Sequence, residues 1–498
     1  MDDGQTLENA EPMPAQEKRQ PSSNPRPERE RPIFAWRDAI EAIVVAVLFT
    51  LLIKQFAVEA YKVPTGSMAP TIIGQEDGGD RILISRIPYS YRDPRRWEIA
   101  VFRYPLNQKI SYIKRVVGLP NESVFILEGN IFTAAPDDDR ESVRNLHARS
   151  ALTVQRKPAA LQDAIFDRYP QIEVSEDGRV NRADFLRDWL VPGPMFADQA
   201  EWAFEGGRVH IESKAQTICR FRHPVTDIRR FAPIDDTNRG GRAIVNDLRL
   251  SMTVHPAEMS GGFLQMVIKD SYRKKPYQAR IPLGDETGTL LIGDREVSSV
   301  PSGLLNDGKP HVVDFTHLDR FLEVRVDGER VASAELSIQP AEAPAPRSGQ
   351  IVGFGVVTGS ATVSHIELQR DIHFLQGSLS RVDIPSDHYF VLGDNSPSSK
   401  DSREWVALEV QISEDGRAAR GDTEAIIDPS DLTQRQDNPF KDDDEGPWKF
   451  VDHLGNIIEI EGDLQVNNRR HAPLVPRKLI IGRAFAVFLP WKRAKLVR

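Results

Sequence analysis

The chain has 498 residues, of which 40% are hydrophobic and 28% are charged, and its formal net charge is −9. This length and composition describe a globular protein of more than one domain. The acidic balance and the lack of a basic stripe argue against nucleic acid as a partner. The single cysteine, Cys219, excludes an intrachain disulfide and a cysteine-based zinc site, and its surroundings favour a structural role.

The N-terminal part of the chain changes from polar to apolar. Residues 1–35 are rich in Pro, Glu, Arg and Gln, which predicts a disordered cytoplasmic tail. The uncharged run AIVVAVLFTLLI that follows is short for a membrane span, but apolar and aromatic flanks extend it, and we expect a transmembrane anchor over 36–58. Because arginines precede this run, the catalytic part is expected on the outer side of the cytoplasmic membrane. A cleaved signal peptide is the alternative, disfavoured by the long polar segment ahead of it.

A serine follows this anchor closely, in the segment PTGSMAPT over residues 64–71. A serine hydroxyl becomes a good nucleophile only when a base takes its proton and donors face the oxyanion that forms. Gly66 permits close backbone approach, so the Ser67 amide and the Thr65 hydroxyl are candidate oxyanion donors. Taken alone, the segment also fits an ordinary loop.

A lysine lies 47 residues later, in the segment YIKRVVGLP over residues 112–120. Strand alternation predicts that Lys114 faces inward and that Arg115 stays solvated. Lysine can act as a base near neutral pH only if its pKa falls from ~10.4 to about 7 or 8, which burial among apolar neighbours achieves. The alternative is a surface Lys-Arg pair.

These two segments, together with GDNSPSSKDSR over residues 393–403, resemble the type I signal peptidases, the Ser/Lys enzymes that remove signal peptides. The resemblance implies that Ser67 is the nucleophile and Lys114 the general base, with Thr65 and the Ser67 amide forming the oxyanion hole. It also implies supporting roles for Ser399, which would position the lysine, and for the ion pair Asp401 and Arg403. The segment over 482–485 resembles the closing strand of the family.

The resemblance also implies a substrate pocket, and it departs from the family at one stretch of the third segment. The walls of a shallow pocket for small residues at positions −1 and −3 of the cleavage site are implied for Tyr61, Val63, Met68, Ile72 and Ile113. Core packing is the alternative for these side chains. Ser396-Pro397-Ser398 stands where the family usually has Arg-Asp-Asn, which indicates a variation in support and not in chemistry.

The remaining chain predicts two insertions. From about residue 201, short alternating segments with turn signals indicate a β-sandwich of the laminin-G or concanavalin jelly-roll type, with Asp327-Gly328 as a tight hairpin. The predicted fold class is therefore mainly β. The expected organisation is tail 1–35, anchor 36–58, catalytic domain 59–132, mixed insertion 133–200, β-sandwich 201–375, catalytic domain 376–405, second insertion 406–473, and closing strand with basic tail 474–498.

The sequence therefore predicts a membrane-bound serine endopeptidase that cleaves signal peptides from exported preproteins. No metal or organic cofactor is expected, and the expected partners are preproteins, the lipid bilayer and an unknown ligand of the sandwich. The alternative is an anchored carbohydrate- or protein-binding sandwich with a degenerate protease domain, because sandwiches of this type often bind sugars or proteins. The oligomeric state and the set of preproteins do not follow from the sequence.

Overall fold

The computed structural model describes residues 32–56, 58–75, 78–136, 152–168, 181–192, 200–227, 243–255, 261–337, 349–413, 416–428, 431 and 434–497. Two compact units, residues 1–55 and 56–498, make up the chain. The predicted tail lies outside the described residues except for its last four positions, which belong to helix α1 (Pro32–Phe56). The fold is mainly β, as predicted.

Helix α1 contains the apolar run in which an anchor was predicted. It is 25 residues long. Among the helices that the structure describes, none combines the length and hydropathy needed to cross a bilayer. The anchor over 36–58 therefore stays a prediction.

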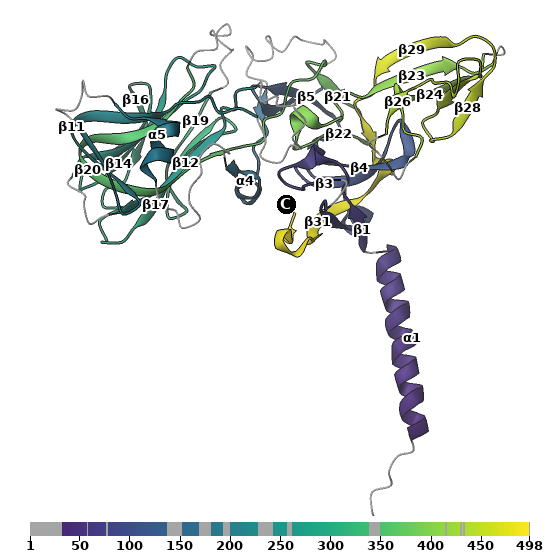
Figure 1. Cartoon of the computed structure of the whole chain (residues 1–498), viewed down its shortest axis with the longest axis horizontal. Coiled ribbons are helices and arrows are strands. Elements are labelled where there is room, and N and C mark those ends of the chain that lie inside the picture. Colours follow the sequence, from purple (N-terminus) through teal and green to yellow (C-terminus); the bar gives the residue numbers. More distant parts are fainter. Residues whose placement is uncertain are drawn as a thin grey trace, which may run out of the picture. The chain divides into compact units, whose positions relative to one another are not determined.

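An eight-stranded antiparallel sheet carries the three segments singled out above (Figure 1). The strand order is β1-β2-β31-β3-β4-β22-β30, and β32 pairs with β31. Strand β31 comes from the C-terminal part of the chain and inserts between β2 and β3, so the predicted closing strand completes this sheet. The strands are β1 (Val58–Lys62), β2 (Arg81–Ser85), β3 (Ile99–Tyr104), β4 (Asn107–Gly118), β22 (His388–Leu392), β30 (Val475–Pro476), β31 (Ile480–Leu489) and β32 (Lys495–Leu496).

A second sheet of four strands, in the order β21-β5-β6-β7, accompanies the first. Its apolar face packs with Val117, Phe390 and Leu392 of the larger sheet in one core. Short helices connect the strands of this region. The elements are β5 (Glu122–Leu127), β6 (Asn130–Ala134), β7 (Thr153–Val154), β21 (Val382–Ile384), α2 (Pro88–Tyr91), α4 (Ala159–Ile165), and the 3₁₀ turns η1 (Gly66–Met68), η4 (Ser396–Ser398), η5 (Arg477–Leu479) and η6 (Trp491–Arg493).

The predicted sandwich region forms one 13-stranded sheet together with β8 (Asp167–Arg168) and β9 (Trp189–Leu190), which come from the preceding insertion. Strand β20 (Ile351–Arg370) is shared by both halves of this sheet. The first part of β20 pairs with β13 and the last part with β12, and the change of partner falls at Thr358-Gly359, where both residues have positive φ. Such a bend lets one strand serve two layers. The terminal strands β16 and β19 lie against each other, so the sheet curls around its core.

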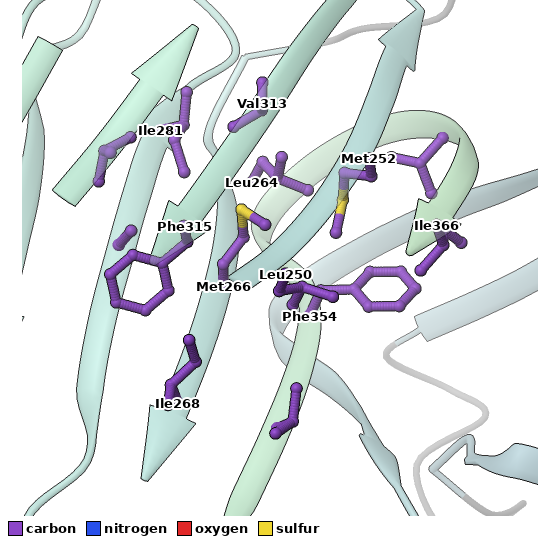
Figure 2. Packing of buried hydrophobic residues seen from close by; sticks show 14 of the residues in the cluster. Leu250, Met252, Leu264, Met266, Ile268, Ile281, Val313, Phe315, Phe354 and Ile366 are labelled. Atoms are coloured by element: carbon purple, nitrogen blue, oxygen red, sulfur yellow. The ribbon is translucent and has the colours of Figure 1, made fainter. Parts of the chain in front are cut away.

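The core inside this curled sheet is large and apolar. Strand β12 buries every second residue, and Leu250 and Met252 meet Met266, Phe315 and Phe354 from other strands (Figure 2). Cys219 is buried in the same core, and burial raises the pKa of its thiol, which agrees with a structural role. The Asp327-Gly328 hairpin is confirmed, with positive φ at both residues.

The elements of this region include every strand that the alternating segments predicted. Residues 182–188 form a helix that gives way to a short strand at Trp189. The elements are β8 (Asp167–Arg168), α5 (Arg182–Asp188), β9 (Trp189–Leu190), β10 (Ala200–Glu205), β11 (Arg208–Phe221), β12 (Leu248–His255), β13 (Phe263–Lys269), β14 (Tyr277–Pro282), β15 (Gly288–Ile292), β16 (Arg295–Val300), β17 (His311–Leu318), β18 (Phe321–Val326) and β19 (Glu329–Glu335).

The second insertion forms three small sheets with a separate core of Leu408, Val410, Ala419, Phe450 and Ile460. Its acidic run over 442–445 lies in an exposed turn. The strands are β23 (Val406–Gln411), β24 (Ala418–Asp422), β25 (Glu424–Ala425), β26 (Gln436–Asp437), β27 (Trp448–Val451), β28 (Ile457–Ile460) and β29 (Gln465–His471).

Candidate active site

Ser67 and Lys114 meet in the first sheet. Thr65 has an extended backbone, and the chain then tightens into η1, which presents the Ser67 side chain toward strand β4. The Nζ atom of Lys114 lies 2.6 Å from Oγ of Ser67. Only 6% of Ser67 and 5% of Lys114 are exposed, so the contact is sheltered from water.

The surroundings of Lys114 favour a neutral amine. Burial lowers its pKa from 10.5 to about 8; the Asp401 carboxylate partly opposes this shift, while Arg403 and Arg435 reinforce it. Among the described residues, no carboxylate lies within ion-pair distance of this amine. A lysine with a pKa of about 8 is present as free amine in about a tenth of the molecules at pH 7, far more than an ordinary lysine would be, and a base requires this neutral form.

The third segment packs directly against the serine turn. The Asn395 backbone N–H donates to the Ser67 carbonyl at 2.9 Å, and its side-chain amide donates to the Gly66 carbonyl at 2.8 Å. Gly393 is required here, because a Cβ atom at this position would lie 2.5 Å from the Ser67 carbonyl oxygen and 2.1 Å from Oγ of Ser399. The turn that holds the serine is therefore fixed by a segment distant in sequence.

Asp401 and Arg403 form a buried bidentate ion pair, with N–O distances of 2.7 Å for both contacts. Asp401 also accepts from the Gly393 N–H, which links the pair to the serine turn. Ser396, in the stretch that departs from the family, accepts from Arg403 at 2.7 Å through its hydroxyl and from the Leu375 N–H at 2.8 Å. In the stretch Ser396-Pro397-Ser398, the Ser396 hydroxyl therefore helps to hold the Arg403 side chain in place.

The hydrogen bond expected from Ser399 to Lys114 is not formed in this structure. Ser399 is 3% exposed and packs against Gly393, but its Oγ atom has no hydrogen-bond partner among the described residues. Among the described residues, Ser67 is the one whose hydroxyl forms a hydrogen bond with Nζ of Lys114. Ser399 therefore contributes packing beside the site.

The prediction that Arg115 stays solvated is wrong. Arg115 is fully buried and forms a bidentate pair with Asp394, at 2.7 Å from Nε and 2.6 Å from Nη2, while Nη1 donates to the Trp97 carbonyl. Thr71 donates to the same carboxylate at 2.5 Å. Strand β4 is covered on both faces at this point, so alternation does not separate a buried from an exposed face. This pair joins the lysine strand, the serine turn and the third segment.

A cavity of about 260 Å³ opens beside the serine and lysine. Its wall includes Tyr61, Val63 and Ile113, as predicted for the pocket, and also Thr65. Met68 and Ile72, predicted for the same wall, do not line it: both are fully buried and pack in the core with Val63, Ile82 and Ile84. Because Met68 lies in η1 and Ile72 follows it, both side chains point into this core. They therefore pack against Val63, a residue of the cavity wall, and do not face the cavity.

Sequence reasoning missed one wall of this cavity. Lys400 lines it and pairs with Asp422 and Glu424 at 2.8 Å each, and Arg435 lines it and pairs with Glu424 at 3.0 Å. Three of these residues belong to the second insertion, which had no role in the sequence-based hypothesis. No local signal in the sequence marks them, because the contacts join segments that are paired only in the folded chain.

Outside this cavity, one group of side chains has the composition of a metal site. Among the described residues, the carboxylates of Asp247, Asp319 and Asp371 lie within 4.8 Å of one another and are buried. The Lys157 ammonium lies 2.5 Å from Asp319 and 2.8 Å from Asp371. An internal cation therefore already compensates part of the charge of this cluster.

The fold and these contacts define a class: a β-sheet protein with a buried Ser–Lys pair at the edge of a small cavity. The family model described as signal peptidase, peptidase S26, matches residues 36–179 and 322–418. Over these two segments, which make up slightly less than half of the chain, the protein is similar to the signal peptidase S26 family. Both Ser67 and Lys114 fall within the matched residues.

Individual relatives agree with this assignment. Signal peptidase I of Pseudomonas fluorescens is 42% identical over 91 residues, which are 16% of this chain and 31% of the relative. A probable signal peptidase I-2 of Synechocystis sp. is 35% identical over 106 residues, covering 20% and 47%. Signal peptidase I of Leptolyngbya laminosa is 32% identical over 133 residues, covering 25% and 61%. The chain thus matches between about a third and three fifths of the length of these relatives.

The solved structures found by comparison are only weakly similar to this chain. A carbohydrate-binding module, CBM66, from Bacillus subtilis covers 36% of this chain and 95% of its own, with 10% identity and a TM-score of 0.26. A likeness this low establishes neither a shared fold nor a shared ligand.

Proposed function

We propose that this protein is a serine endopeptidase that removes signal peptides from exported preproteins, with Ser67 as nucleophile and Lys114 as general base. The observation that carries the proposal is the 2.6 Å contact between Nζ of Lys114 and Oγ of Ser67, both sheltered from water. The lowered pKa of the lysine, about 8, supports it. The family of the matched segments supplies the substrate class.

The proposed reaction has two halves. Neutral Lys114 takes the proton of the Ser67 hydroxyl as Oγ bonds to the carbonyl carbon of the scissile peptide, and the resulting oxyanion is stabilised by the Ser67 N–H and the Thr65 hydroxyl. When the C–N bond breaks, the Lys114 ammonium gives its proton to the leaving amine. Lys114 then takes a proton from water as the water oxygen attacks the carbonyl carbon of the acyl ester. When the ester C–O bond breaks, Lys114 gives this proton to Oγ of Ser67, and the signal peptide leaves with a new carboxyl group.

The remaining site residues have supporting roles in this proposal. Asp401 and Arg403 hold the third segment against the serine turn, and Ser399 fills the space beside the lysine. Tyr61, Val63 and Ile113 form the wall against which small substrate side chains pack. The small volume of the cavity, about 260 Å³, suits residues such as alanine at the cleavage site.

We also propose that α1 anchors the protein in the cytoplasmic membrane with its N-terminus inside, because its apolar run follows several arginines. Proteolysis of the first thirty residues in sealed vesicles of known orientation tests this placement. Digestion of that segment from the outer side would contradict it.

Cleavage of a preprotein whose signal peptide ends in Ala-x-Ala tests the chemistry. Ser67→Ala and Lys114→Ala are expected to lower kcat/KM by about 10³-fold or more, because each removes one half of the pair. Ser90→Ala and Lys309→Ala are matched controls on exposed positions, with full activity expected. Unchanged cleavage by either site variant would exclude the proposed pair and would favour the binding-module alternative.

A further inference from the structure

A second cavity, of about 490 Å³, lies between the second insertion and the eight-stranded sheet that carries Lys114. The insertion contributes strands β24 and β29 and the turn after β27, while the sheet contributes the start of β22 and the turn η5. The Gln108 backbone N–H donates to the His453 carbonyl at 2.9 Å, so the two sides are held together. The cavity is therefore built from both parts of the chain.

The polar side chains of this cavity are almost all basic. Its lining contains Arg420, Arg470 and Lys478 together with three histidines, and it contains no aspartate or glutamate. The side chains of Arg420, Arg470 and Lys478 are solvent-exposed, and no ion pair to a described carboxylate is formed by any of them. Three positively charged side chains therefore line the same cavity.

Two features indicate that these cations act together. Burial and the neighbouring Arg470 lower the pKa of Arg420, so the two guanidinium groups feel each other's charge, with the cross-strand residue Glu409 opposing. The strand register places Arg420 opposite Glu409 and Arg470 opposite Ala407 of the same strand, β23, so both arginines point from one face of this sheet. In addition, Nδ1 of His453, which also lines the cavity, is buried without a hydrogen-bond partner among the described residues.

We infer that this basic cavity binds a phosphate-bearing anion. Two guanidinium groups and an ammonium match the charge and the several acceptor oxygens of a phosphate group better than a single carboxylate, and arginine pairs with phosphate through two parallel bonds. The unpartnered histidine nitrogen offers a further contact. A bound dianion also relieves the repulsion between the arginines. Free phosphate compounds and phospholipid headgroups share this chemistry.

Binding is tested on the full chain in neutral detergent micelles, at constant ionic strength, by thermal unfolding and isothermal titration. The probes are inorganic phosphate, a short-chain phosphatidic acid, a short-chain phosphatidylcholine and an oligoglutamate peptide. We expect a saturable rise in Tm with phosphate or phosphatidic acid. Binding of inorganic phosphate but not of phosphatidic acid would identify a soluble phosphate compound as the ligand. Binding of phosphatidic acid but not of inorganic phosphate would identify a phospholipid headgroup.

Substitutions distinguish binding in this cavity from nonspecific attraction of anions to the positive charge of the insertion. Arg420→Gln combined with Arg470→Gln is expected to weaken binding by about tenfold or more, because two charge-assisted contacts are lost. Arg469→Gln is the matched control, since Arg469 is the strand neighbour of Arg470, points to the opposite face and does not line the cavity. Its binding should be unchanged.

The inference is overturned by any of three results. These are the lack of saturable binding by both phosphate probes, an equal loss of binding in Arg469→Gln, and tighter binding of oligoglutamate than of either phosphate probe. Lys478→Gln provides a second variant on a different element, η5, with a smaller loss expected. Cleavage of a preprotein is not used as a readout, so the result is independent of the proposed peptidase activity.

Discussion

Lys114 and Lys157 are both buried, and each lies near an aromatic ring, at 5.6 Å from Tyr112 and 5.2 Å from Trp97 respectively. Their pKa values nevertheless move in opposite directions. Lys114 meets a hydroxyl, and burial lowers its pKa to about 8. Burial also acts to lower the pKa of Lys157, but the carboxylates of Asp319, Asp371 and Asp247 outweigh it and raise the value.

The comparison shows that burial alone does not make a lysine a base. Burial lowers the pKa of Lys114 because few countercharges lie close enough to compensate for lost hydration. The same loss at Lys157 is compensated by ion pairs of 2.5 and 2.8 Å. One lysine is therefore suited to exchanging a proton, and the other to holding the sandwich insertion against the part of the chain that carries Trp97.

The largest change in stability is expected from Lys157→Met. This substitution leaves three buried carboxylates without their cation, and breaking a buried ion pair by removing one partner costs about 3–5 kcal/mol. Denaturant unfolding measures the loss. Adding Asp319→Asn to the variant should recover part of it, because one uncompensated charge is removed. A loss below about 1 kcal/mol would show that the carboxylates are protonated or hydrated in the folded protein.

Lys114→Met is expected to increase the free energy of unfolding, in contrast to Lys157→Met. The folded state lowers the lysine pKa from 10.5 to about 8, which at neutral pH corresponds to a destabilisation of about 3 kcal/mol. Replacing the amine with an apolar side chain of similar length should therefore stabilise the protein by up to that amount while cleavage is lost. The unfolding midpoint at pH 7 is the measurement. A destabilised Lys114→Met variant would contradict the proposed cost of burying the amine.

The pH dependence of cleavage should follow Lys114 and not Lys157. Since the neutral amine is the proposed base, kcat/KM is expected to rise about tenfold per pH unit up to about 8 and then level off. The same shift makes unfolding stability rise with pH between about 8 and 10.5, because in this window the unfolded state binds more protons at this lysine. A rate that is flat from pH 6 to 9 would exclude a titrating lysine base.

The sequence anticipated much of this site because the needed residues lie in short, recognisable segments. Ser67, Lys114 and the Asp401–Arg403 pair each belong to one of three segments whose order resembles that of the signal peptidases. The curled sheet was also foreseen, since its strands bury alternate residues and its hairpin at Asp327-Gly328 uses a turn with local signals.

What the sequence could not supply are contacts between distant segments. Arg115 and Asp394 are 279 residues apart, and nothing near Arg115 indicates that β4 is covered on both faces. Lys157 and Asp319 are 162 residues apart and belong to segments without a motif. Met68 and Ile72 were assigned to the pocket by position in a motif, which does not fix the direction of a side chain that leaves a 3₁₀ turn.

The smallest expected effect tests whether the second insertion tunes Lys114. Arg435 lines the cavity and its charge lowers the pKa of Lys114, so Arg435→Gln should move the acid limb of the kcat/KM profile to higher pH. Arg435→Lys keeps the charge and should keep the limb near its original position, whereas a purely structural role would make both variants alike.

Arg469→Gln removes a charge of the same sign from the same insertion, away from this cavity, and serves as the control. A limb that moves equally in both glutamine variants would reflect net charge. A limb that moves in neither would place Arg435 outside the electrostatic environment of the base. The neutral state of Lys114 would then depend on burial and Arg403 alone, and the second insertion would act on the site only through Lys400 and the carboxylates that hold it.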